Sequence, residues 1–142
     1  MSHKREKIAS IIHSLEGSQF DPHYLGFFEC FNQQLFFEAH EVLEELWLGQ
    51  RNTAKGLFYK GLIQLAGAFV HIQKRRRQPA IALFQLARDN LGRFPTTYES
   101  LDLGKLQGHI ISWIKSLQSD DQLCLTFESC GWPKLSIEPA QS

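Results

Sequence analysis

The chain has 142 residues, of which 43% are hydrophobic and 21% are charged, a balance typical of globular proteins and unlike that of disordered chains. Fifteen basic and fifteen acidic residues cancel, so no overall field would attract nucleic acid or an anionic membrane. The length suffices for one domain with its own core. We therefore expect residues 1–142 to form a single helical domain that binds neither nucleic acid nor membranes.

Three cysteines, Cys30, Cys124 and Cys130, are an odd number without CxxC spacing. This pattern fits neither a disulfide framework nor a four-thiolate zinc site. It predicts three thiols and a reducing, cytoplasmic location. The longest apolar-rich stretch, residues 56–72, is interrupted by three polar residues, which indicates a buried helix and not a membrane-spanning one.

Helical periodicity predicts the elements of the N-terminal half. Isoleucine and leucine recur at helical spacing over residues 4–15, which predicts a first helix. Asp21 followed by Pro22 is a helix-start signal, and the helical pattern then continues to Trp47. We expect a break near Asn32, because one helix of that length would be unusual in so small a domain.

A turn at residues 49–53 separates this region from a long apolar helix, so the two form an antiparallel hairpin. The later helices are predicted over residues 54–74, 78–91 and, more weakly, 106–117. The last segment, residues 119–142, reads as an irregular tail with a strand-like piece at Leu123, Leu125 and Phe127. The predicted fold class is all-α, a compact helical bundle built around the hairpin.

The string FFEAHEVLEELW, residues 36–47, has a wide apolar face when plotted at about 100° per residue. His40 lies at the edge of that face, and Glu44 follows one turn later, with the two Cβ atoms about 5 to 6 Å apart. Phe37 flanks the pair, and Trp47 lies on the apolar face. We therefore expect His40 and Glu44 to be partly buried and Trp47 to be buried.

The next helix carries a polar stripe of Lys60, Gln64 and His71, beside small residues that would let another helix approach closely. Gln64 and His71 are almost two turns apart, which is about 10 Å along the axis. Part of this stripe could therefore meet His40 and Glu44 across the hairpin.

Two main interpretations of these residues remain open, beside the binding of some other small ligand. In the first, His40, Glu44 and His71 hold a divalent metal such as zinc or manganese, water completes the site, and Glu41 is the general base of a hydrolase. In the second, His40, Glu44, Gln64 and His71 form a structural hydrogen-bonded network that fixes the register of the hairpin.

A third hypothesis is a non-enzymatic module that binds a protein partner or assembles with itself. Exposed aromatic side chains would provide its surface, and Phe27, Phe28, Phe31 and Trp113 are the candidates. The run of bases at residues 74–77 is expected to cap helix carbonyls. The identity of a small-molecule substrate or protein partner is left open.

The string FNQQLFFEAHEVLEELW, followed by KGLIQLAGAFVHIQK and IALFQLARDNL, resembles domain-of-unknown-function family 309 over roughly residues 25–92. The family pattern H-x-x-x-E-x-x-W is matched by His40, Glu44 and Trp47. Further matching positions are Asn32, Phe37, Glu41, Gly61, Gln64 and His71. The resemblance implies a compact all-α fold. It also favours a metal site, because members are sometimes labelled predicted metal-dependent hydrolases.

Overall fold

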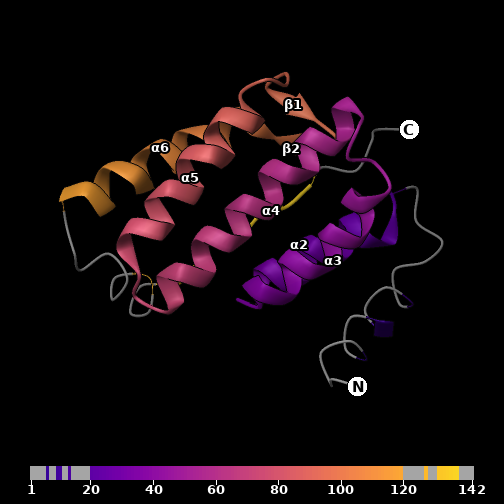
Figure 1. The fold of residues 1–142 in the computed structure, drawn as a ribbon, viewed down its shortest axis with the longest axis horizontal. Coiled ribbons are helices and arrows are strands. Elements are labelled where there is room, and N and C mark those ends of the chain that lie inside the picture. Colours follow the sequence, from indigo (N-terminus) through magenta and orange to yellow (C-terminus); the bar gives the residue numbers. More distant parts are fainter. Residues whose placement is uncertain are drawn as a thin grey trace.

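The computed structural model describes residues 20–119, 127 and 131–137, together with residues 6, 9, 10 and 13. Its elements are α2 (Pro22–Asn32), α3 (Phe36–Leu48), α4 (Ala54–Gln73), α5 (Arg77–Leu91), β1 (Thr97–Tyr98), β2 (Leu101–Asp102) and α6 (Leu103–Ser119). Successive helices pack against each other, α2 on α3, α3 on α4, α4 on α5 and α5 on α6 (Figure 1). The predicted helical bundle with its hairpin, α3 and α4, is confirmed.

Two expectations fall partly outside the described residues. Of the predicted first helix, the four described positions are all helical, namely Glu6, Ala9, Ser10 and His13. Of the alternating run in the tail, Phe127 is described, and it is helical and not extended. Leu123, Leu125, Cys124 and Cys130 lie outside the described residues, so the prediction of three thiols stays a prediction.

The predicted start of α2 and the predicted break after it are both present. Asp21 caps the helix, since its Oδ1 accepts from the backbone N–H of His23 at 2.8 Å, and Pro22 occupies the first turn. At the other end Gln34 has a left-handed backbone with φ 61°. The N–H of Leu35 then donates to Cys30 O at 2.9 Å, which closes the helix as in a Schellman motif.

The α4 helix is capped at both ends. At its start Thr53 Oγ1 accepts from the N–H of Gly56 at 3.0 Å. At its end Arg75 is left-handed, with φ 58°, and the N–H of Arg76 donates to His71 O at 2.8 Å. From the same basic run, Arg77 Nη1 donates to Leu117 O at 3.0 Å, so this side chain caps the last turn of α6.

Aromatic side chains dominate the buried core. Phe69 of α4 is fully buried and contacts rings of five other segments, namely α2, α3, α5, α6 and the tail. The hypothesis of an exposed aromatic surface is wrong for three of its four residues. Phe27, Phe28 and Phe31 are at most 5% exposed, because the inward face of α2 is where the chain places its largest apolar side chains. Trp113 is half-buried and packs on Phe69.

A short β-hairpin, which the sequence analysis did not predict, follows α5. Thr97 pairs with Asp102 and Tyr98 with Leu101. The two-residue turn between the strands, Glu99 and Ser100, has positive φ at both positions, as a type I′ turn requires. The α6 helix begins at Leu103, ahead of the predicted residue 106.

Asn32 fixes the described part of the tail to the end of α2. Its Nδ2 donates to Leu135 O at 2.7 Å, and its Oδ1 accepts from the N–H of Leu135 at the same distance. Ile137 then forms an isolated antiparallel bridge with Leu101. Within the described part of the tail, residue 137 therefore has strand-like pairing. Among the helices that the structure describes, none has the length and apolar character to cross a membrane.

Candidate functional site

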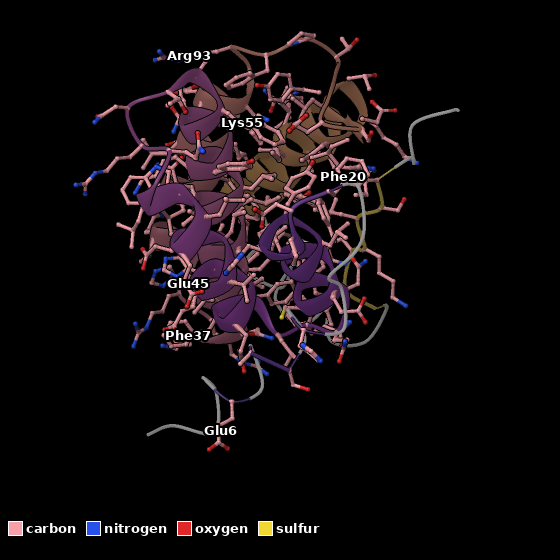
Figure 2. The ribbon with its side chains drawn as sticks, turned by 90° about the vertical axis from the view of Figure 1, so that its right-hand side faces the viewer. Glu6, Phe20, Phe37, Glu45, Lys55 and Arg93 are labelled. Carbon is pink, nitrogen blue, oxygen red and sulfur yellow. The ribbon has the colours of Figure 1, made fainter. Side chains whose placement is uncertain are left out.

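A cavity of about 320 Å³ lies between α3, α4 and α5. Its polar lining is His40, Lys60, Gln64 and His71, and its apolar lining is Phe37, Ile63, Gly67, Val70 and Leu83. The structure thus brings His40, Gln64 and His71 together, as the stripe predicted. Phe37 stands at the surface, 48% exposed (Figure 2).

The spacing of residues along α4 creates the floor of this cavity. Lys60, Gln64, Gly67 and His71 recur at intervals of three or four residues, so they share one face of the helix. Gly67, on this floor, lets Leu83 of α5 approach α4 closely, because a Cβ at this position would lie 3.1 Å from Leu83 Cδ1.

Gln64 is oriented by a residue that the sequence analysis missed. Asn90 Nδ2, on α5, donates to Gln64 Oε1 at 2.7 Å. Because the amide oxygen is occupied, the Nε2 donors of Gln64 remain for a bound molecule. Asn90 can approach because Gly61 of α4 lets α5 come close. A Cβ on Gly61 would lie 2.7 Å from Leu91 and 3.4 Å from Asn90 Cβ. The predicted close approach of another helix is thus confirmed at Gly61.

Both histidines of the cavity have a buried nitrogen that lacks a hydrogen-bond partner in the described part of the chain. These atoms are Nδ1 of His40 and Nδ1 of His71. Burial lowers the pKa of His71, and the nearby charges of Arg76 and Lys74 lower it further. His71 is therefore neutral at neutral pH. Unpartnered buried polar atoms are rare in proteins and are often found at functional sites.

The two predicted carboxylates do not line this cavity. Glu44 Oε2 lies 3.9 Å from His40 Nε2, beyond hydrogen-bond distance, and the Glu44 side chain is 44% exposed. Glu41 is half-buried outside the cavity wall. The proposed network of His40, Glu44, Gln64 and His71 is therefore not formed, since none of these four is hydrogen-bonded to another.

The metal-site hypothesis requires His40, Glu44 and His71 to meet at one point. A catalytic zinc site normally has three protein ligands. Among the residues that the structure describes, no three His, Cys, Asp or Glu side chains are grouped to hold a metal ion. His40 and His71 thus line one cavity, whereas Glu44 does not.

Lys60, which lines the cavity, contacts Trp47, which does not line it. Lys60 Nζ lies 4.5 Å from the centroid of the Trp47 ring, a cation–π contact between α3 and α4. Trp47 is half-buried and packs against the core. It is less buried than the sequence predicted, because one face of the ring is covered by a lysine and not by the core.

We expect Trp47→Leu, Lys60→Met and the double variant to show a coupling free energy of about 0.5 to 1 kcal/mol, as for a cation–π contact at a partly exposed site. Urea unfolding of the wild type and the three variants measures it. Strict additivity of the two single losses would show that the contact does not stabilise the fold.

The comparisons with known proteins concern the part of the chain that holds this cavity. Residues 24–91 match DUF309, a domain of unknown function. The match confirms the resemblance seen in the sequence, and it includes every residue that lines the cavity. The DUF309 region covers slightly less than half of the chain and leaves out the β-hairpin and α6.

A curated relative of the chain is an uncharacterised protein from Aquifex aeolicus (strain VF5), which is 27% identical over 75 residues. The aligned segment is 53% of this chain and 22% of that protein. The chain thus spans about a fifth of the length of this relative. No solved structure matches the chain.

Proposed function

We propose that the cavity between α3, α4 and α5 binds a small organic molecule that has an apolar body and a hydrogen-bond-accepting group, such as a carboxylate. The observation that carries this proposal is the donor character of the polar wall. Lys60 and the Nε2 atom of Gln64 are donors, and a histidine presents one N–H even when neutral. Among the described residues that line the cavity, none is an Asp or a Glu.

The size and the remaining walls support the same class of ligand. A volume of about 320 Å³ is at the small end of the range for ligand pockets, which are mostly apolar with a few placed polar groups. Phe37, Ile63, Val70 and Leu83 provide such walls. Lys74 and Arg76 add positive charge beside His71.

Titration of ¹⁵N-labelled protein with sodium benzoate tests the proposal, with benzyl alcohol as the probe that keeps the ring and lacks the charge. We expect benzoate to shift the amide signals of Gly67, Val70 and His71 more strongly than benzyl alcohol. Gly67→Leu, which places a side chain over the cavity floor, should abolish these shifts.

The matched control is Gly108→Leu, on α6, where a Cβ would meet no atom within 4 Å. It should bind benzoate as the wild type does. Lys60→Met, which removes the charge at similar length, should weaken benzoate binding without any steric change. Equal benzoate affinity in Gly67→Leu and Gly108→Leu would exclude this cavity as the site.

Metal binding is the second candidate, in a hydrolase or in a metal-binding protein. It is favoured by the presence of His40 and His71 at one cavity, each with an unpartnered buried nitrogen. A metal there would need Glu44, Glu41 or the bound molecule as its third ligand. Zinc and manganese are the ions to test, as histidine and carboxylate ligands suit both.

The Glu44→Gln variant separates the two candidates. Without a metal, the loss of a partly exposed carboxylate 3.9 Å from His40 should cost at most about 1 kcal/mol. We then expect EDTA to leave the melting temperatures of wild type and variant unchanged. A wild type that is destabilised by EDTA and rescued by zinc or manganese, beside an insensitive Glu44→Gln, would establish the metal site instead.

A further inference from the structure

A second cavity, of about 690 Å³, lies where the start of α2, the first turns of α4 and the β1–β2 turn meet. It shares no lining residue with the first cavity. Phe20, Tyr24, Lys55, Tyr59 and Glu99 line it, and they come from segments far apart in the sequence. Figure 2 labels Phe20 and Lys55, two residues of its wall.

Aromatic rings form one side of this cavity. The ring centroids of Phe20 and Tyr24 are 6.0 Å apart, and those of Tyr24 and Tyr59 are 6.1 Å apart. The ring of Tyr24 is tilted by 45° against that of Phe20 and by 51° against that of Tyr59, so it stacks face to face with neither. Ring faces with this arrangement attract cations through their quadrupoles.

Tyr59 has a hydroxyl group that the fold does not use. The residue is 4% exposed, and its hydroxyl makes no hydrogen bond to any other described residue. It is not one of the polar atoms sealed from solvent, so a molecule in the cavity can reach it. By contrast, the hydroxyl of Tyr24 is occupied, since it donates to Glu99 O at 2.8 Å. Burial and the charges of Glu99 and Asp21 raise the pKa of Tyr59, so the phenol stays neutral.

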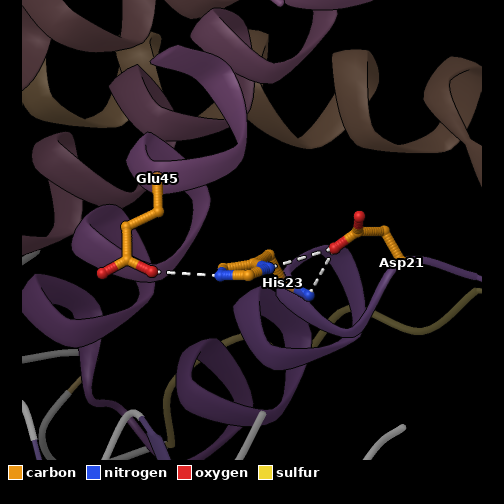
Figure 3. A network of polar contacts seen from close by, with 3 residues as sticks. All are labelled: Asp21, His23 and Glu45. Atoms are coloured by element: carbon orange, nitrogen blue, oxygen red, sulfur yellow. Dashed lines mark hydrogen bonds and ion pairs between the residues drawn. The ribbon is translucent and has the colours of Figure 1, made fainter. Parts of the chain in front are cut away.

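Two carboxylates face the same space, and each has one oxygen left over. Asp21 Oδ1 contacts the backbone N and the ring Nδ1 of His23 at 2.8 and 3.2 Å, which leaves Oδ2 (Figure 3). Glu99 Oε1 pairs with Lys55 Nζ at 2.9 Å, which leaves Oε2. The described residues of the lining therefore carry two negative charges and one positive charge. Glu45 Oε2 lies 3.0 Å from the Nε2 atom of His23, on the opposite side of that ring from Asp21 (Figure 3).

We infer that this cavity binds a small organic cation, namely a protonated amine carried on an apolar body. The ammonium group donates to the open oxygens of Asp21 and Tyr59, and the apolar body packs on the rings of Phe20 and Tyr24. Charge-assisted hydrogen bonds and ring faces are together the usual means of recognising such a group.

The β1–β2 turn, which carries Glu99, is held in place by contacts with neighbouring residues. Glu99 and Ser100 have φ of 50° and 63°, a left-handed backbone that glycine or asparagine usually occupies. The hydroxyl of Tyr24 and the ion pair with Lys55 hold this turn from two sides. The carboxylate of Glu99 is therefore presented to the cavity without a need to reorder the turn on binding.

Titration of the ¹⁵N-labelled chain with benzylammonium chloride tests the inference, with benzyl alcohol and sodium benzoate as probes of the same shape. We expect benzylammonium to bind most tightly and to shift the amide signals of Asp21, Tyr59 and Glu99. Benzoate should shift the signals of the first cavity instead, so failure at one cavity is distinguishable from failure at the other.

Three variants are expected to change the affinity for benzylammonium, two by weakening it and one by tightening it. Tyr59→Phe should weaken benzylammonium binding by about tenfold through the lost charge-assisted hydrogen bond, without lowering the melting temperature, since no bond within the protein is lost. Asp21→Asn, which keeps a good helix cap, should weaken binding to a similar extent. Lys55→Met should tighten it, because the competing charge is removed.

The matched control is Tyr98→Phe, which removes a phenol hydroxyl from a residue that does not line the cavity, and it should bind as the wild type does. Three results would overturn the inference: benzyl alcohol that binds as tightly as benzylammonium, equal affinity in Tyr59→Phe and Tyr98→Phe, or no shift at Asp21, Tyr59 and Glu99 at any benzylammonium concentration.

Discussion

Phe69→Ala is expected to destabilise the protein by about 3 to 5 kcal/mol, the usual cost of truncating a buried aromatic side chain. The ring is fully buried and lies 5.0 Å from the ring of Phe36, in a stacked arrangement. It also meets Trp113 edge-on at 5.1 Å and Phe127 at 5.6 Å. A cavity here would therefore loosen α3, α6 and the tail together. Guanidinium unfolding, followed by tryptophan fluorescence, measures the loss.

Phe37→Ala is the control for this prediction, because it removes the same side chain from the surface, where it is 48% exposed. It should change the free energy of unfolding by less than about 1 kcal/mol. Phe69→Leu, which retains much of the volume, provides an intermediate value if the alanine variant does not fold. Equal losses in Phe69→Ala and Phe37→Ala would contradict the central position of Phe69 in the core.

The helices could be predicted from the sequence because their signals are local. The apolar spacing within α4 and the Asp21–Pro22 start of α2 act over one or two turns. The order of packing also followed, since short connections force successive helices to lie side by side. The break near Asn32 was foreseen from length alone, and its mechanism was not.

The sequence could not predict the sites where residues other than glycine have a left-handed backbone. Gln34, Arg75, Glu99 and Ser100 all have positive φ. None of them is a residue type that is typical of a left-handed turn. The local free-energy cost of this conformation is compensated by tertiary contacts, which the sequence pattern does not reveal. The β-hairpin was missed for this reason.

Among the residues of the two cavities, too, some could be placed from the sequence and others could not. His40, Gln64 and His71 were placed together because helical periodicity and an antiparallel hairpin are enough to do so. Glu44 is a helical neighbour of His40, but the cavity includes Phe37 on the other side of His40 and leaves Glu44 out. The second cavity joins segments near residues 21, 55 and 99, and no local pattern could relate them.

Gly56→Ala is expected to destabilise the protein by about 1 to 3 kcal/mol, although alanine is the better helix former by about 1 kcal/mol. A Cβ at Gly56 would lie 1.9 Å from Gln50 O and 2.7 Å from Gln50 C. These are backbone atoms, so no side-chain rotation relieves the overlap, and the loop before α4 must move.

The matched control is Gly108→Ala, within α6, where a Cβ would meet no atom within 4 Å. It should stabilise the protein by up to about 1 kcal/mol through helix propensity. The two variants should thus change the free energy of unfolding in opposite directions in the same urea titration. Since Gln50 and Thr53 line the larger cavity, displacement of this loop in Gly56→Ala should also weaken benzylammonium binding, whereas Gly108→Ala should bind normally. A gain in stability for both variants would show that the loop is free to move away and does not fix the cavity wall.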